Sequence, residues 1–136
     1  MKKLFILFLF PFAIHAQEVI ENKNETTETA DVWTGDKSKE YSFNLLESYR
    51  QRVLKGEKMS DLAKLYSEDP GSAKNGGLYA NVKRGMMVPE FENVAFSLKS
   101  GEISKVFETK YGFHFIQVVS NHGETVDVRH ILLMFK

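Results

Sequence analysis

The chain has 136 residues, so it has room for one small domain and not for a two-domain enzyme of ordinary size. Its 18 basic and 18 acidic residues balance, which leaves no overall positive field for binding nucleic acid or an anionic membrane surface. The absence of cysteine excludes disulfide bonds, thiolate metal ligands and a cysteine nucleophile. Stability must therefore come from a packed core.

Residues 1–16 predict a secretory signal peptide. Two lysines are followed by an apolar run over 4–12 and by the small residues Ala13 and Ala16. A membrane anchor is the alternative, but the run is shorter than the roughly 20 apolar residues that cross a bilayer. We expect export to the periplasm or the medium, with cleavage after Ala16 favoured and cleavage after Ala13 as the other site.

Residues 17–37 predict a disordered acidic leader. This segment has six acidic residues and few large apolar side chains, so it cannot bury enough surface to offset the entropy of ordering it. Val32 and Trp33 are exceptions, and the alternative is that they dock on the domain as an edge strand. The folded domain is expected over 38–136.

About four helical segments are expected in the folded domain. Apolar residues at intervals of four predict a helix over 38–54, which Gly56 can end. Ser60 is the predicted N-cap of a short second helix, and 72–74 are expected to form a helical turn. Pro89 predicts the start of a third principal helix that ends before residue 101.

Four segments predict strands, and the last two predict a hairpin. They are residues 78–83, 106–109, 113–119 and 126–134, of which 113–119 is rich in β-branched and aromatic residues.

The hairpin turn predicts which side chains meet across the last two strands. A three-residue loop of Asn121, His122 and Gly123, with the glycine in the left-handed conformation, puts His114 directly opposite His130. Slipping the register by one residue would turn the two histidines to opposite faces of the sheet, so the inference depends on the loop length.

A facing pair of histidines has several interpretations. The simplest is a hydrogen-bonded pair that supports the core without chemistry. A metal site is disfavoured because no third ligand is placed beside the pair. A serine hydrolase is disfavoured because no G-x-S-x-G motif is present, and Gly76 and Gly77 are not followed by the G-K-[ST] of a phosphate-binding loop.

The run over residues 66–119 resembles the parvulin family of peptidyl-prolyl cis-trans isomerases. It contains, in order, the motifs S-x-D-P-G-S-A, G-G, R-G-x-M-V-P-E-F-E, A-F-x-L, G-E-I-S and Y-G-x-H. The resemblance implies an α+β fold, in which an antiparallel four-stranded sheet packs with about four helices. It also implies a cofactor-free, metal-free site in which two histidines face each other.

One departure from the family pattern is large. Parvulins usually begin with a strand carrying a histidine in a pattern such as R-H-I-L, whereas here V-R-H-I-L-L stands at 128–133. The favoured interpretation is circular permutation, with the first strand moved to the C-terminus. The alternative is that residue 128 starts a second copy in a tandem protein, whose strand fills the gap or swaps between chains.

The resemblance assigns further site residues. Met87 and Phe91 would hold the prolyl ring, with Tyr79 as a wall of the pocket, although Met87 and Phe91 could also be plain core. Asp69 matches a position beside the target peptide, or else it caps its turn. Thr109 matches a hydroxyl that could orient one imidazole.

Two functions remain open for this domain. One is an exported prolyl isomerase that acts on proline-containing polypeptides and assists their folding. The other is a peptide-binding chaperone module that has lost turnover. No preference for phosphorylated substrates is expected, because the chain ends three residues after Leu133, where phosphate-directed members carry a basic loop. A monomer is favoured over a strand-swapped dimer.

Overall fold

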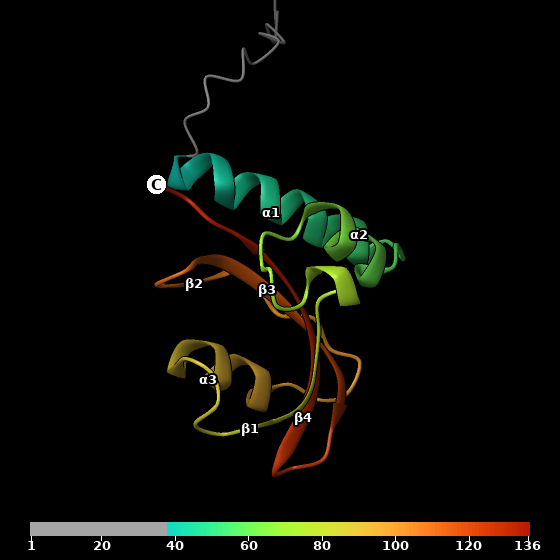
Figure 1. Ribbon diagram of the computed structural model, residues 1–136. Coiled ribbons are helices and arrows are strands. Elements are labelled where there is room, and N and C mark those ends of the chain that lie inside the picture. The colour runs from blue at the N-terminus through green and yellow to red at the C-terminus, as the bar shows by residue number, and fades with distance from the viewer. Residues whose placement is uncertain (1–37) are drawn as a thin grey trace, which may run out of the picture. The chain divides into compact units, whose positions relative to one another are not determined.

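The computed structural model describes residues 38–136 (Figure 1). The predicted signal peptide over 1–16 and the predicted leader over 17–37, including the docking of Val32 and Trp33, lie outside the described residues. No helix within 38–136 has the length and hydrophobicity needed to span a bilayer.

A four-stranded antiparallel sheet forms the centre of the domain, as expected. Its strands are β1 (Leu78–Lys83), β2 (Phe107–Thr109), β3 (Gly112–Asn121) and β4 (Thr125–Leu133), in the spatial order β1-β4-β3-β2. The strand nearest the C-terminus thus lies inside the sheet, paired with β3 on one side and with β1 on the other. Both of its edges are hydrogen-bonded, which makes β4 a structural centre of the domain.

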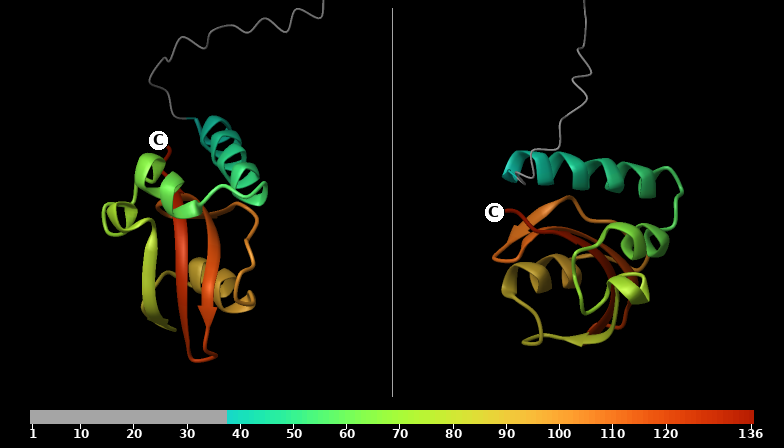
Figure 2. Two further views of the ribbon diagram at one scale, coloured as in Figure 1. Left: turned by 90° about the vertical axis from the view of Figure 1, so that its right-hand side faces the viewer. Right: turned by 45° about the horizontal axis from the view of Figure 1, so that its top comes forward.

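Three α-helices and one short 3₁₀ helix accompany the sheet in the described part of the chain. They are α1 (Lys39–Leu54), α2 (Met59–Tyr66), η1 (Ala73–Asn75) and α3 (Pro89–Ser97). Helices α1 and α2 lie on one side of the sheet and α3 on the other (Figures 1 and 2). The number and placement of these elements agree with the α+β fold expected from the sequence.

The helix ends follow local chemistry, with one correction. The side chain of Ser38 accepts a hydrogen bond from the backbone N–H of Tyr41 and so caps α1. Ser60 was expected to cap α2 but is its second residue. The cap position is held by Lys58, whose side chain makes no capping bond. The helix therefore begins two residues earlier than the N-cap preference of serine predicts.

Two apolar clusters lie on opposite faces of the sheet. The first joins α1 and α2 to the sheet through Leu46, Val53, Met59, Leu62, Ala63, Phe113, Phe115, Ile131 and Leu133. The second joins α3 to the sheet through Val82, Phe91, Ala95, Ile116, Val118, Val126 and Val128. Side chains alternate along a strand, so the even-numbered positions of β3 and β4 near the histidines face α3.

The hairpin register differs from the prediction by two residues. His130 pairs with Ile116, and His114 pairs with Leu132, so the two histidines are not directly opposite. Next to the turn, Asn121 pairs with Val126 and β4 begins at Thr125, so the loop is residues 122–124 and not the predicted 121–123, and the pairing there differs from the prediction by three residues. A bulge between Val118 and Ser120 reduces that difference to two, which counting loop residues could not anticipate. A shift of two preserves the side-chain face, so both histidines still lie on the α3 face, diagonal to each other. Gly123 has the expected positive φ, 84°.

Two glycines allow β4 to fit between its neighbours. Gly77 has φ of +75°, and a Cβ there would lie 2.3 Å from the carbonyl oxygen of His130. The carbonyl of Gly77 instead accepts a hydrogen bond from the N–H of His130, at 3.0 Å. At the other end of the strand, a Cβ on Gly112 would lie 2.3 Å from the carbonyl oxygen of Leu133. Glycine at these two positions is therefore required by close backbone approach.

Candidate active site

A cavity of about 380 Å³ opens on the face of the sheet that α3 covers. Most of its wall is apolar, formed by Pro70, Met87, Val88, Phe91, Leu132 and Met134. Tyr79 and Tyr111 add aromatic surface, and the ionisable lining groups besides them are Asp69, His114 and His130. No lysine or arginine lines this cavity among the described residues.

The two histidines lie at the base of this cavity. His114 comes from β3 and His130 from β4, and each is only 3% exposed. Their Nδ1 atoms are 3.2 Å apart, and their rings are nearly parallel, with an interplanar angle of 16°. The diagonal register is thus compatible with direct contact, because the rings lean toward each other across the strand pair.

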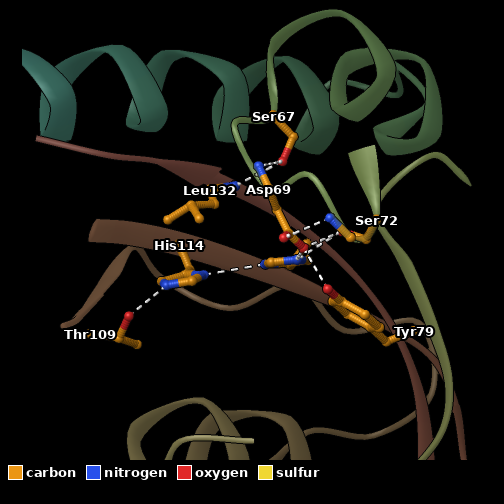
Figure 3. A network of polar contacts seen from close by, with 9 residues as sticks. Ser67, Asp69, Ser72, Tyr79, Thr109, His114 and Leu132 are labelled. Carbon is orange, nitrogen blue, oxygen red and sulfur yellow. Dashed lines mark hydrogen bonds and ion pairs between the residues drawn. The ribbon is translucent and has the colours of Figure 1, made fainter. Parts of the chain in front are cut away.

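Asp69 holds the outer nitrogen of one imidazole. Its Oδ2 lies 2.8 Å from Nε2 of His130. The hydroxyls of Ser72 and Tyr79 donate to the same oxygen, at 2.6 Å and 2.8 Å (Figure 3). The backbone N–H of Gly71 donates to the other carboxylate oxygen, at 3.1 Å. The carboxylate is therefore hydrogen-bonded from several directions.

Thr109 holds the outer nitrogen of the other imidazole. Its Oγ1 lies 2.7 Å from Nε2 of His114 (Figure 3). The same oxygen accepts a hydrogen bond from the N–H of Tyr111. No buried side-chain nitrogen or oxygen within 38–136 lacks a hydrogen-bond partner. The polar chain from Asp69 to Thr109 is thus complete, as burial requires.

One arrangement of protons satisfies this chain when both rings are neutral. An ionised Asp69 can only accept, so Nε2 of His130 carries its proton and Nδ1 of that ring is an acceptor. His114 then donates from Nδ1 to His130, and its Nε2 accepts from the hydroxyl of Thr109. Each neutral ring has one donor and one acceptor nitrogen, and all four nitrogens are used within the protein.

The surroundings shift three pKa values in directions that support this arrangement. Hydrogen bonds, first from His130 and then from Ser72 and Tyr79, hold the pKa of Asp69 well below its ordinary value. Burial, with a contribution from neighbouring His130, lowers the pKa of His114 to about 3. Burial and the hydrogen bond to Asp69 raise the pKa of Tyr79 to about 12. At neutral pH, Asp69 is therefore charged, and His114 and Tyr79 are neutral.

Aromatic side chains enclose the imidazoles. The ring of Phe91 on α3 meets His130 edge to face, with centroids 5.3 Å apart, and meets His114 in the same way at 5.9 Å. Phe107 on β2 stacks on His114 with an interplanar angle of 16°. This apolar enclosure strengthens the hydrogen bonds between the rings by lowering the local dielectric.

The structure brings together all seven residues selected from the sequence. Asp69, Thr109, His114 and His130 form the polar chain, and the other three, Tyr79, Met87 and Phe91, line the cavity.

Sequence reasoning missed other contributors to the site. Ser72 is 1% exposed and contacts both Asp69 and His130, although the sequence predicted only a helical turn over 72–74 and no site role for this serine. Its position three residues after Asp69 is a usable signal, since hydroxyls near an aspartate commonly bond within such turns. Phe107, Tyr111 and Met134 were also missed.

No metal centre is evident in the described region. Within residues 38–136, no group of three or more histidine, aspartate or glutamate side chains is arranged so that it could hold a metal ion. The only two buried histidines there are bonded to each other, to Asp69 and to Thr109.

The fold and the cavity define a class of small α+β domains with a mostly apolar pocket over a pair of buried histidines. The model of the rotamase family, described as the PPIC-type PPIase domain, matches residues 21–120. The chain belongs to this family, the parvulin-type peptidyl-prolyl isomerases. Strand β4, with His130, lies beyond the matched residues.

Similar proteins include bacterial foldases and chaperones. The chain is 52% identical over 80 residues to the foldase protein PrsA of Caldanaerobacter subterraneus and 42% identical over 81 residues to the chaperone SurA of Nitrosococcus oceani. These matches cover 59% and 60% of this chain but only 25% and 19% of the relatives. The chain therefore spans about a quarter or less of these two relatives.

A solved structure shares the fold. The crystal structure of the peptidylprolyl isomerase PrsA from Bacillus cereus superimposes with a TM-score of 0.55 at 35% identity. The match covers 58% of this chain and 31% of that one. The likeness supports the family assignment and the parvulin architecture.

Proposed function

We propose that this domain is a peptidyl-prolyl cis-trans isomerase that rotates X-Pro bonds in polypeptide substrates. The observation that carries the proposal is the polar chain of Asp69, His130, His114 and Thr109 at the base of an apolar cavity. Membership of the PPIC-type family and the similarity to a foldase and a chaperone support it.

The reaction needs shape and electrostatics but no broken bond. The planar amide resists twisting with a barrier of roughly 18–20 kcal/mol, and uncatalysed rotation takes on the order of 10–100 s. A site accelerates rotation by binding the twisted amide better than the planar one. In our proposal Met87 and Phe91 enclose the prolyl ring, which leaves the remainder of the peptide to turn about the bond.

The histidines act by positioning in this proposal. All four of their ring nitrogens are occupied by protein partners, so neither ring has a free nitrogen to exchange a proton with the substrate. Their contribution is a rigid, polarised base to the pocket, fixed at one end by Asp69 and at the other by Thr109. This role fits a reaction in which no proton must be transferred.

A rate measurement tests the proposal. Wild-type protein should accelerate the cis-to-trans conversion of an X-Pro peptide in a protease-coupled assay, and Met87→Ala should lower kcat/KM by on the order of tenfold through loss of apolar contact. Met86→Ala is the matched control, because Met86 is 60% exposed and does not line the cavity. A wild-type rate equal to the uncatalysed rate would refute the proposal.

The chaperone relative favours a second candidate, a peptide-binding module without turnover. Both candidates predict binding of proline-containing peptides in the cavity. They differ in rate, because a binding module would saturate with peptide while leaving the exchange rate of the bound peptide unchanged.

Unphosphorylated substrates fit the cavity best. Its lining has a carboxylate, Asp69, and no basic side chain among the described residues that could pair with a phosphate. Paired peptides with phosphorylated and plain Ser-Pro should therefore show no preference for the phosphorylated form. A marked preference for it would contradict this part of the proposal.

Export and circular permutation also remain our proposals. The three-part segment over 1–16 supports export to the periplasm or the medium, and mass spectrometry of the expressed protein should show cleavage after Ala16. The strand order β1-β4-β3-β2, in which β4 lies inside the sheet, supports circular permutation. A variant with residues 125–136 joined ahead of α1 through a flexible linker should keep its activity and unfolding free energy.

A further inference from the structure

Asp69 is the point at which three elements of the site meet. Its Oδ2 receives hydrogen bonds from the hydroxyl of Ser72 at 2.6 Å and the hydroxyl of Tyr79 at 2.8 Å, and it lies 2.8 Å from Nε2 of His130. Gly71 donates its N–H to Oδ1. Two of these donors, Ser72 and Gly71, belong to the same loop as Asp69 and would accompany any movement of it.

Tyr79 differs from the other two because it reaches Asp69 from β1. An apolar side chain at this position would serve equally well as a wall of the cavity, so the hydroxyl needs a separate explanation. Glycine at position 71 leaves room for the hydroxyl, because a Cβ there would lie 2.5 Å from the Tyr79 oxygen. Tyr79 from β1 and His130 from β4 are therefore the two side chains that join the Asp69 carboxylate to the sheet, and Tyr79 is the one that does so through a hydroxyl (Figure 3).

The ring of Tyr79 also touches both the cavity and the histidine pair. It lines the cavity, and its centroid lies 5.4 Å from that of His130 with a tilt of 37°. A prolyl substrate in the cavity would press on this ring, while the hydroxyl at its far end bonds Asp69. One side chain thus connects the surface that meets the substrate with the carboxylate that fixes the protons of the imidazoles.

We propose that Tyr79 is a positioning residue for the isomerase, whose hydroxyl keeps the Asp69 carboxylate aimed at His130. Loss of this bond leaves the cavity wall intact but frees one lone pair of a half-enclosed carboxylate. The ring protons of His130, and through it of His114, are then held less firmly. The catalytic part of this inference rests on the proposed isomerase function, whereas the effect on Asp69 does not.

Tyr79→Phe is the direct test, made in the full chain. The carboxyl carbon of Asp69 should titrate, by NMR, well below the ordinary range in wild type and about one pH unit higher in the variant, because a hydrogen bond to the charged form is removed. The titratable groups facing Asp69 are Tyr79 and His130, with His114 one ring further away.

Tyr111→Phe is the matched control for this experiment. Tyr111 lines the same cavity, is 54% exposed and is not among the donors to Asp69. The Asp69 midpoint should stay at its wild-type value in this variant. An unchanged midpoint in Tyr79→Phe, or an equal change in both variants, would overturn the inference.

Kinetics supply the second readout. If wild-type protein isomerises an X-Pro peptide, Tyr79→Phe should lower kcat on the order of threefold to tenfold at little change in KM, and the acid limb of the pH profile should move upward. An inactive wild type would refute the proposed function alone, since the Asp69 titration needs no turnover. Should Tyr79→Phe not fold, Tyr79→Leu also keeps an apolar wall and removes the same hydroxyl, and an unmoved Asp69 midpoint there would overturn the account.

Discussion

The two faces of the sheet are built from the same strands but on different principles. Toward α1 and α2, the strands present Phe113, Phe115 and Ile131, which pack into a continuous apolar cluster. Toward α3, the same strands present Ile116 and Val128 but also the buried histidines. One face excludes water by burial alone, whereas the other encloses a hydrogen-bonded polar chain beside an open cavity.

This difference separates stability from function along a single strand. A buried polar group destabilises unless it is fully hydrogen-bonded, so the α3 face gains little stability from its histidines and depends on every partner being present. The α1–α2 face has no such requirement, and its side chains contribute by burial. Substitutions on the two faces should therefore have different consequences for folding and for turnover.

The largest expected effect comes from the apolar face. Phe115 is fully buried, and Phe115→Ala should lower the free energy of unfolding by about 3–5 kcal/mol, through lost burial and a residual cavity. Chemical denaturation measures the loss, and the folded fraction should retain near-normal turnover. Val119→Ala, at a 44% exposed position, should cost less than about 1 kcal/mol. Equal losses in the two variants would contradict the assignment of the core.

The second prediction concerns pH and the polar face. The pKa of His114 is about 3 in the folded protein against an ordinary 6.5, so below pH 6.5 the unfolded chain binds a proton that the folded protein does not. Stability from this group is therefore complete above pH 6.5 and falls as the pH drops toward 3. At about 1.4 kcal/mol per pH unit, the loss between pH 7 and about 4.5 should reach roughly 2–3 kcal/mol.

Asp69 adds a further loss at lower pH. Its folded pKa is lowered from 3.8, so its contribution is present above that pH and disappears as the pH falls below it. Denaturation at a series of pH values measures both losses. Val119→Ala is the control, since it removes no titratable group from a 44% exposed position and should leave the slope unchanged. A His114→Gln variant with the wild-type slope would contradict the prediction.

The smallest expected effect tests one hydrogen bond on the polar face. Thr109→Val keeps the shape of the side chain but removes the hydroxyl that lies 2.7 Å from Nε2 of His114, leaving a buried acceptor without its donor. The free energy of unfolding should fall by about 1–3 kcal/mol, together with turnover. Thr125→Val, on a half-buried threonine, is the matched control. A Thr109→Val variant indistinguishable from this control would show that the hydroxyl is dispensable.

Local chemistry made most of the fold predictable. The strand over 78–83, the helix starting at Pro89 and the left-handed glycine at 123 all follow from residue types with strong conformational preferences. The predicted face of the histidines was correct because two deviations combine: the turn shifts the pairing by three residues and the bulge after Val118 takes back one, which leaves an even shift. Their exact pairing was not predictable, since neither the longer turn nor the bulge follows from counting loop residues.

The residues that the family resemblance assigned to the site were predictable, but one residue of the same motifs, Ser72, was not assigned. Met87 lies just before helix α3 and Phe91 lies in its first turn, and the resemblance to parvulins selected both. Ser72 was missed because its hydroxyl acquires a role only when the loop folds back onto β4, some 58 residues further along the chain. The cavity rim at Tyr111 and Met134 depends in the same way on long-range packing.

The central claim is that β4 and the family-matched segment together form one working isomerase site. Exchange NMR on an X-Pro peptide mixed with the labelled protein tests it most directly, because one sample reports both turnover and location. We predict exchange cross-peaks between cis and trans peptide at mixing times below about one second, far faster than the uncatalysed rate. Shift changes should centre on Met87, Phe91, His114 and His130. Absence of exchange from a saturated complex, or shift changes away from the cavity, would contradict the account.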